Sequence, residues 1–230
     1  MKSTFYIVGT PIGNLEDMSF RAVKTLKEVD LILCEDVSNT QKLLKHFEIE
    51  TKCTNYFANS RLGKIDEIIN LLEDGKNLAL VSDAGMPTIS DPGSLLIQKI
   101  YEAKDGGLEV DIKVIPGPTA LTSALALSGF TGGEFIFYGF LPHKKGRETI
   151  FKEIADSKKI SVFYESVHRV EKCLESLEKF LDGNRKIVIA KEITKIYEEV
   201  VRGDILEVKK YFLENKDKIR GEFVVIVDSK

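Results

Sequence analysis

Residues 80–93, LVSDAGMPTISDPG, overlap a short apolar run at 78–81 that is typical of a buried strand. The segment holds two glycines and two prolines, namely Gly85, Gly93, Pro87 and Pro92. Glycine permits backbone conformations closed to other residues, and proline fixes φ and removes an N–H donor, so we expect a rigid loop whose amides have fixed directions. Loops at the carboxyl ends of parallel strands bind ligands in α/β folds. The sequence therefore predicts a ligand-binding loop; the alternative is an ordinary crossover turn.

On either side of this loop, short apolar runs alternate with amphipathic ones. The apolar runs predict strands at 5–8, 31–34, 78–81 and 110–115. Apolar residues three and four positions apart predict helices at 21–28, 41–46, 65–72 and 95–103. This alternation indicates a mainly parallel sheet with helices on its faces. A further helix is expected at 120–127, after the PGP turn, with Thr119 as its cap.

The second half of the chain has a different organisation. Strands are expected at 135–138, 160–164, 187–190, 198–201 and 223–227, several of them joined by short connections, and helices near 148–154, 170–180 and 205–213. These elements indicate a mixed sheet. The expected fold is therefore α/β with two αβ domains, a parallel-rich N-terminal sheet in residues 1–128 and a mixed C-terminal sheet in 134–230, with a cleft between them. SGFTGGE at 128–134 is the expected linker.

Composition narrows the class of protein. Of 230 residues, 43% are hydrophobic, which is enough for a substantial core, and no apolar run reaches the ~20 residues of a membrane span. Three scattered cysteines and three histidines indicate neither a disulfide framework nor a metal site. A cytoplasmic protein without a metal is therefore expected. The net charge of −3 argues against general attraction to nucleic acid, although residues 143–169 hold seven Lys or Arg against four acids, an excess of three.

Two further loops follow predicted strands. Residues 9–14, GTPIGN, match neither GxGxxG nor the Walker pattern, so a dinucleotide or triphosphate site is not expected. Pro11 would instead present an apolar ring edge that suits an adenine or a thioether, while Asn14 and Ser19 are expected helix caps. After the second strand, Glu35 and Asp36 lie side by side, so one carboxylate is expected to face the cleft. The alternative is that Asp36 or Ser38 simply caps the next helix.

Eight motifs occur in order along the chain: TPIGNLEDMS, CEDVSNT, LVSDAGMPTISDPG, IPGPTALTSALALSG, GFLPHKKGR, FYESVHR, KEITKIYEEVVRG and GEFVVIV. Together they resemble the ribosomal small-subunit methyltransferase I family over nearly the whole chain. The resemblance implies the tetrapyrrole methylase fold, with S-adenosylmethionine (SAM) bound in the cleft, and a homodimer. It also implies methylation of the ribose 2′-hydroxyl of a cytidine in the decoding region of 16S ribosomal RNA, free or in the small subunit. One departure is Met86, where the family usually has threonine.

The resemblance assigns cofactor contacts residue by residue. In the first half these are Asp83, Ala84, Gly85 and Ile89, acting mostly through backbone groups, followed by Thr119 and Ala120 of the PGPTA turn. In the second half they are Glu165, Ala190, Gly221, Glu222 and Phe223, the last three beside the adenine. These residues are expected to hold SAM together with Pro11.

Methyl transfer requires the ribose hydroxyl to lose a proton on or after attack, so a base or a cation is expected nearby. Lys191 and Glu192 follow the buried run at 187–190 and are the preferred catalytic pair, with Lys191 facing the acceptor and Glu192 orienting it. Other candidates are Lys195, Glu35, Arg169 and Glu222. A structural ion pair is the alternative role for each of them.

GFLPHKKGR, with SVHR after it, is the predicted RNA-binding segment. Lys144, Lys145, Arg147 and Arg169 would contact phosphates, while Phe140 or His143 would stack on a displaced base. The alternative is a solvated charged face. For the whole chain, the alternatives are a methyltransferase of a tetrapyrrole or other small molecule, a methyltransferase of a modified histidine on a translation factor, and a ribosome-assembly factor without turnover.

Overall fold

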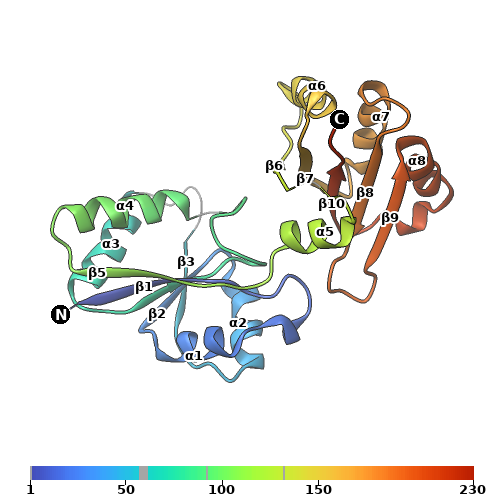
Figure 1. Cartoon of the computed structure of the whole chain (residues 1–230). Helices are drawn as coiled ribbons and strands as arrows, with labels where there is room; N and C mark the ends of the chain where they lie inside the picture. Colours follow the sequence, from blue (N-terminus) through green and yellow to red (C-terminus); the bar gives the residue numbers. More distant parts are fainter. Residues whose placement is uncertain (1, 57–61, 92, 132) are drawn as a thin grey trace. The chain divides into compact units, whose positions relative to one another are not determined.

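The computed structural model describes residues 2–56, 62–91, 93–131 and 133–230, with only the backbone of Leu62. The chain divides into two compact units, Met1–Thr119 and Ala120–Lys230 (Figure 1). Each unit contains one five-stranded sheet, so the predicted α/β fold with two sheets is confirmed. Pro92 of the first loop and Gly132 of the expected linker lie outside the described residues.

The first unit is an all-parallel sheet of order β3-β2-β4-β1-β5. Its strands are β1 (Ser3–Val8), β2 (Leu31–Cys34), β3 (Cys53–Asn55), β4 (Leu78–Leu80) and β5 (Val110–Ile115). Its helices are η1 (Leu15–Asp17), α1 (Phe20–Glu28), α2 (Val37–His46), α3 (Leu62–Glu73) and α4 (Ser94–Asp105). The four predicted strands and four predicted helices are confirmed. The edge strand β3 was missed because its three residues form no apolar run.

Apolar residues on both faces of this sheet explain why its inner strands β2 and β4 are continuous apolar runs. Ile32 and Cys34 pack with α1 and α2, whereas Leu33 between them packs with α3 and α4. Successive side chains of a strand point to opposite faces, so covering both faces requires apolar residues throughout. The ligand loops are therefore left at the strand ends.

The second unit is a mixed sheet of order β6-β7-β10-β8-β9, in which β6 and β7 are parallel and β10 is antiparallel to both β7 and β8. Its strands are β6 (Phe135–Phe140), β7 (Ile160–Ser166), β8 (Lys186–Lys191), β9 (Glu199–Asp204) and β10 (Glu222–Val227). Its helices are α5 (Ala120–Ser128), α6 (Arg147–Asp156), α7 (Val170–Phe180), α8 (Ile205–Glu214) and η2 (Lys216–Lys218). The predicted mixed sheet is confirmed.

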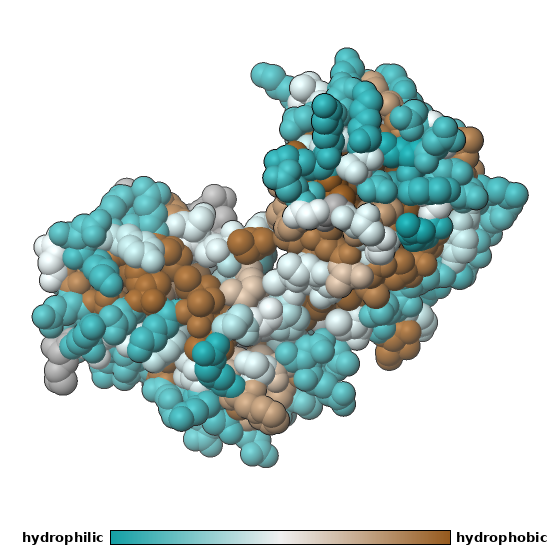
Figure 2. All heavy atoms as spheres, in the orientation of Figure 1, coloured by the Kyte–Doolittle hydropathy of each residue, from teal (hydrophilic) through white to brown (hydrophobic). Residues whose placement is uncertain are grey.

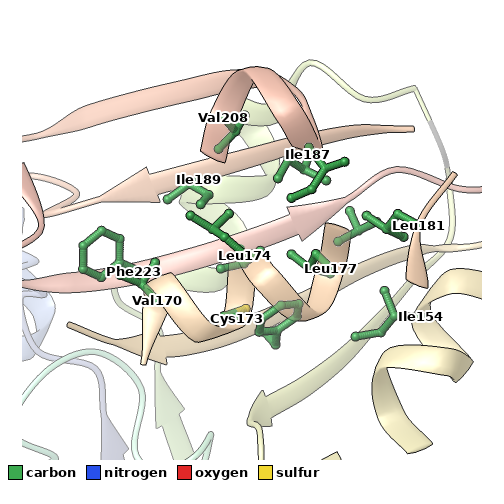
Figure 3. Close-up of a cluster of buried hydrophobic side chains, with 14 of the residues drawn as sticks. Ile154, Val170, Cys173, Leu174, Leu177, Leu181, Ile187, Ile189, Val208 and Phe223 are labelled. Atoms are coloured by element: carbon green, nitrogen blue, oxygen red, sulfur yellow. The ribbon is translucent and has the colours of Figure 1, made fainter. Parts of the chain in front are cut away.

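One face of this second sheet is covered by α7 and α8. Val170, Cys173, Leu174 and Leu177 of α7 recur every three or four residues and lie over strand residues that include Ile189 (Figure 3). This spacing places them on one side of the helix. The outer surface of α6, α7 and α8 is mostly hydrophilic (Figure 2). Among the described residues, no helix combines the length and the apolar character needed to cross a membrane.

Helix α5 belongs to the second unit, although the sequence placed residues 120–127 in the first domain. It packs against β7, β8 and β10 of the second sheet, and the Arg202 Nε–H on β9 donates to the Ser128 carbonyl over 3.1 Å. Small buried residues, Ala124 and Ser128, let the helix approach the sheet closely. The sequence of a short helix that is apolar on most sides does not predict which sheet the helix packs against, because the helix has no distinct polar face to orient it.

Candidate functional site

The loops that follow β1 and β4 are hydrogen-bonded to each other. The Thr10 N–H donates to the Gly85 carbonyl over 2.9 Å, and the Gly85 N–H donates to the Thr10 carbonyl over 3.2 Å. The Thr10 hydroxyl also donates to the Ser82 carbonyl over 3.1 Å. These bonds fix the backbone of the predicted ligand loop, and Thr10 is a contributor that sequence reasoning missed.

A pair of glycines brings the loop after β5 against the loop after β1. A Cβ placed on Gly117 would lie 2.8 Å from the Gly9 carbonyl carbon, and one placed on Gly9 would lie 2.7 Å from the Gly117 Cα. No side chain fits at either position. The carboxyl ends of β1, β4 and β5, which are adjacent in the sheet, thus form one backbone-lined edge.

Gly85 lies in this edge with a φ of +87°, and a Cβ there would be 3.3 Å from Ile12 Cγ2. The neighbouring Asp83, Ala84 and Ile89 are exposed, whereas Pro11 is buried. Two non-glycine residues of the same loop, Thr88 and Ser90, also have positive φ, at 74° and 62°. Such strained backbone is concentrated at functional sites, and the rigid loop predicted from the sequence is therefore consistent with ligand binding.

Four carboxylates gather beside this loop. Asp36 accepts hydrogen bonds from the Ser38 and Asn39 amides as the N-cap of α2, so the capping alternative is confirmed for Asp36. Its own N–H donates to Asp83 Oδ1 over 3.3 Å. Burial and then the charge of Asp83 raise the pKa of Glu35. Burial and the charge of Glu35 raise the pKa of Asp91 to about 6. The loop therefore carries a concentration of carboxylates, which suits a cationic ligand.

In the second unit, three predicted residues form a row across the sheet. Phe223 on β10 pairs with Glu165 on β7 and with Lys191 on β8. Paired residues of antiparallel strands point to the same face, and here that face is the one covered by α7 and α8. The Phe223 side chain belongs to the core, and Ala190 is also fully buried. The side chains of Phe223 and Ala190 therefore offer no surface to a ligand.

The predicted catalytic pair is divided between two ion-pair groups. Lys191 Nζ lies 3.2 Å from Glu199 Oε2, and the lysine side chain is only 4% exposed. The same glutamate binds Lys218 and Tyr211. Burial opposes its ionisation, but these donors outweigh that effect and lower the pKa of Glu199 to about 2. The expectation that Glu192 orients Lys191 is therefore wrong: Lys191 is bound by Glu199, a partner that sequence reasoning missed.

Glu192 instead binds Lys195 and the start of β10. Lys195 Nζ lies 3.1 Å from Glu192 Oε1 and 2.9 Å from Glu222 Oε2, and the Glu222 N–H donates to Glu192 Oε1 over 3.0 Å. A Cβ on Gly221 would collide with the Glu192 carboxylate. Burial favours neutral Lys195, but its bonds to Glu222 and Glu192 outweigh burial and raise the pKa of Lys195. Lys195 therefore remains a cation.

The predicted RNA-binding residues fall into two groups. His143, Lys144 and Lys145 are exposed on the loop before α6, and Phe140 at the end of β6 is 56% exposed. Arg147 and Arg169 instead bind the buried carboxylate of Glu165, with contacts of 2.6 and 2.7 Å. Their predicted role as free phosphate ligands does not agree with this geometry. Among the residues that the structure describes, no group of three His, Cys, Asp or Glu side chains could hold a metal ion.

The architecture of the two units is shared with solved methyltransferase structures. The crystal structure of the methyltransferase CobJ matches with a TM-score of 0.71 and 17% identity, covering 100% of this chain and 95% of that one. The cobalamin biosynthetic enzyme cobalt precorrin-4 methyltransferase, CbiF, matches with a TM-score of 0.68 and 18% identity, covering 98% and 94%. At these identities the likeness shows the fold alone.

Sequence comparison narrows this class to a family. A sequence model described as Tetrapyrrole (Corrin/Porphyrin) Methylases matches residues 4–209. Proteins named ribosomal RNA small subunit methyltransferase I match from Thermotoga maritima, with 45% identity over 97% of both chains, and from Bacillus subtilis, with 43% identity over 97% of this chain and 74% of that protein. The chain belongs to the tetrapyrrole methylase family and, within it, to the ribosomal RNA small subunit methyltransferase I group.

Proposed function

We propose that this chain is a SAM-dependent methyltransferase of small-subunit ribosomal RNA, and that its acceptor is the ribose 2′-hydroxyl of a cytidine in the decoding region of 16S RNA. The observation that carries the proposal is the match to the Thermotoga maritima protein, 45% identical over 97% of both chains. A cytoplasmic location and a homodimer are further parts of the proposal.

The backbone-lined edge of the first unit supports SAM as the cofactor. SAM carries a sulfonium and an ammonium, so its site needs backbone groups, an apolar wall and nearby oxygens. Asp83 and Ala84 supply exposed backbone beside the buried Gly85, Ile89 supplies apolar surface, and Thr119 lies at the end of the same unit. The carboxylates of Glu35 and Asp91 supply negative charge. When bound, SAM supplies the methyl group; the loop's contribution is to hold it in one orientation.

We predict that SAM affinity rises with pH because Asp91 must ionise to attract the cofactor's cationic groups. Its pKa of about 6 places this change within a range where the protein can be studied. Between about pH 5 and about pH 7, calorimetry should show an affinity increase of roughly 3- to 10-fold in wild type and a clearly smaller one in Asp91→Asn, where Glu35 is left to titrate. An equal increase in the variant would mean that another group titrates.

The stability of Asp91→Asn provides an independent control on the same carboxyl. Its folded pKa lies above the ordinary 3.8, so ionisation opposes folding, and the wild type loses stability as pH rises from about 4 to about 6. The variant should therefore be more stable than wild type above pH 6, by about 1 kcal/mol once solvent screening of this half-buried group is allowed for. Below about pH 4 the two proteins should have equal stability.

The second unit contributes the remaining proposed cofactor contacts through its backbone. Ala120 starts α5, Glu165 and Ala190 lie at strand ends, and Gly221 has a φ of +81°, which turns the chain into β10. Gly221, Glu222 and Phe223 are proposed to meet the adenine through their main-chain groups, because the Phe223 side chain is in the core. Pro11 is buried, so the apolar contact with the cofactor that was expected of it is not part of this proposal.

For catalysis, we favour Lys195 over Lys191 as the cation that stabilises the ribose oxygen as it loses its proton. Lys195 is partly exposed and is held by the carboxylates of Glu192 and Glu222. Lys191 is buried and forms an ion pair with Glu199. Glu192 then orients the cation, and its positive φ of 50° is the kind of strain kept at functional positions.

The two lysines can be separated by Lys195→Met and Lys191→Met. We expect Lys195→Met to slow single-turnover methyl transfer at saturating SAM and RNA by about 100-fold, with little change in either affinity. Lys191→Met should leave the transfer rate within about 3-fold but lower the melting temperature, because Glu199 loses a buried partner. The opposite pattern would restore Lys191 as the catalytic residue.

The acceptor is tested in cells. Mass-spectrometric mapping of 16S RNA from cells lacking the protein should show one ribose methylation missing, and purified protein with labelled SAM should restore it on small subunits or free RNA. A catalytically impaired variant, Lys195→Met, serves as the matched control. An unchanged methylation map would refute the RNA acceptor, and transfer to a tetrapyrrole instead would favour the small-molecule alternative.

A further inference from the structure

A buried ion cluster lies beneath the basic loop of the second unit. The Glu165 side chain has no exposed surface and contacts Arg147 Nη2 at 2.6 Å and Arg169 Nε at 2.7 Å. The Ser166 N–H donates to the same carboxylate over 2.9 Å. The arginine side chains are only 13% and 17% exposed. We name this group, Arg147, Glu165 and Arg169, the Glu165 clamp.

Both arginines of the clamp have a second task. Arg169 Nη1 donates to the Leu141 carbonyl over 2.8 Å, and Arg147 Nη1 donates to the Pro142 carbonyl over 3.3 Å. Each guanidinium therefore joins the buried carboxylate to the first carbonyls of the loop at 141–146. A planar guanidinium has several N–H donors that point in different directions, so it can contact the carboxylate and the carbonyl at once. The ammonium of a lysine is a compact point charge and cannot span both acceptors in this geometry.

The loop held in this way carries the exposed residues His143, Lys144 and Lys145. Its end enters α6 through Gly146, whose φ is +85°. Two carbonyl anchors at the start and the Arg147 anchor at the end leave the loop little freedom. Fixing it in the free protein lowers the ordering cost of binding a ligand.

We propose that Glu165 is a positioning residue that acts through Arg147 and Arg169; this proposal depends on the proposed function, in which the substrate is RNA. The clamp holds the loop at 141–146 in one conformation and so presents His143, Lys144 and Lys145 to the RNA phosphates and bases. The two arginines are then supports of the RNA-binding loop and not its ligands. This assigns a role to the Glu165 side chain that is separate from any backbone contact of that residue.

The conservative variants Arg147→Lys and Arg169→Lys test the proposal because they keep the charge but not the double contact. Limited trypsin digestion of the folded variants should cleave after Lys144 and Lys145 at least about 5-fold faster than in wild type, since a released loop opens more often. RNA affinity should fall by about 5- to 10-fold, while SAM affinity stays unchanged. If both variants are cleaved at the wild-type rate, the proposal that the Glu165 clamp holds the loop is refuted.

A double-mutant cycle distinguishes support from direct contact. If Arg169 acts through the loop, Arg169→Lys should weaken RNA binding in the wild-type background but not in a Lys144→Gln/Lys145→Gln background. An equal loss in both backgrounds would make Arg169 an RNA ligand and overturn the proposal. If Lys144→Gln/Lys145→Gln itself leaves RNA binding unchanged, the loop's role in RNA binding fails, while the trypsin rates still decide whether the clamp holds the loop.

Arg185 offers a matched control for general destabilisation. It is also a buried arginine, and it donates to the carbonyls of Ile154, Ser157 and Asp228 over 2.8 to 3.1 Å, at the other end of α6. Arg185→Lys should lower the melting temperature but leave cleavage after Lys144 and Lys145 and RNA affinity as in wild type. If it reproduces the effects of Arg169→Lys, those effects come from lost stability and the proposal is refuted.

Discussion

Gly85→Val is expected to abolish SAM binding, with a loss of affinity of at least about 100-fold, while the protein stays folded. Gly85 has a φ of +87°, and its backbone pairs with Thr10 in both directions. A Cβ there would lie 3.3 Å from Ile12 Cγ2 and 3.5 Å from the Pro118 carbonyl oxygen. A branched side chain would fill this backbone-lined edge and disfavour the conformation that aligns the loop. Calorimetric titration with SAM measures the loss.

Gly107→Val is the matched control for this prediction. Gly107 also has a positive φ, +110°, but nothing lies within 4 Å of a Cβ built on it. Both variants pay a left-handed backbone cost of about 1–2 kcal/mol, so both should melt a few degrees lower. Only Gly85→Val should lose SAM. Normal binding by Gly85→Val, or an equal loss in Gly107→Val, would show that the cofactor does not lie at this loop.

Lys144→Glu with Lys145→Glu is expected to weaken RNA binding by about 100-fold at low salt, because two exposed cations become anions beside the phosphates. The slope of log affinity against log salt should become shallower by about 1.4, which corresponds to about two lost phosphate contacts on single-stranded RNA. SAM affinity should not change. Filter binding of 16S RNA fragments over a salt series measures both quantities.

Lys42→Glu with Lys45→Glu makes the same change of charge on the exposed surface of α2, in the first unit. It controls for the change in net charge of the whole protein, which by itself weakens attraction to RNA. A smaller effect with an unchanged salt slope is expected there. If both pairs change the slope equally, Lys144 and Lys145 belong only to a solvated surface and the RNA-binding loop must lie elsewhere.

The local pattern of apolar and polar residues in the sequence was sufficient to predict most of the helices and strands. The strand at 31–34 has the predicted bounds, because an apolar run of that length is typical of a strand buried on both faces. The edge strand at 110–115 also has the predicted bounds, although Asp111 and Lys113 interrupt its apolar residues. Asn14 and Ser19 cap η1 and α1 as predicted, since a cap depends on the side chain and the next few amides. The glycines of the first loop also mark unusual backbone after β4, since Gly85 and Gly93 have positive φ.

The sequence by itself thus determined the two sheets, their helices and the loop at which we place SAM, because each of these depends on residues close together in the chain. Only the tertiary structure decided which sheet α5 covers and which partners the charged residues take. Lys191 binds Glu199, and Arg147 binds Glu165, eighteen positions away. An ion pair depends on which strand ends and helix starts meet in space, and a charged residue carries no signal of its partner along the chain.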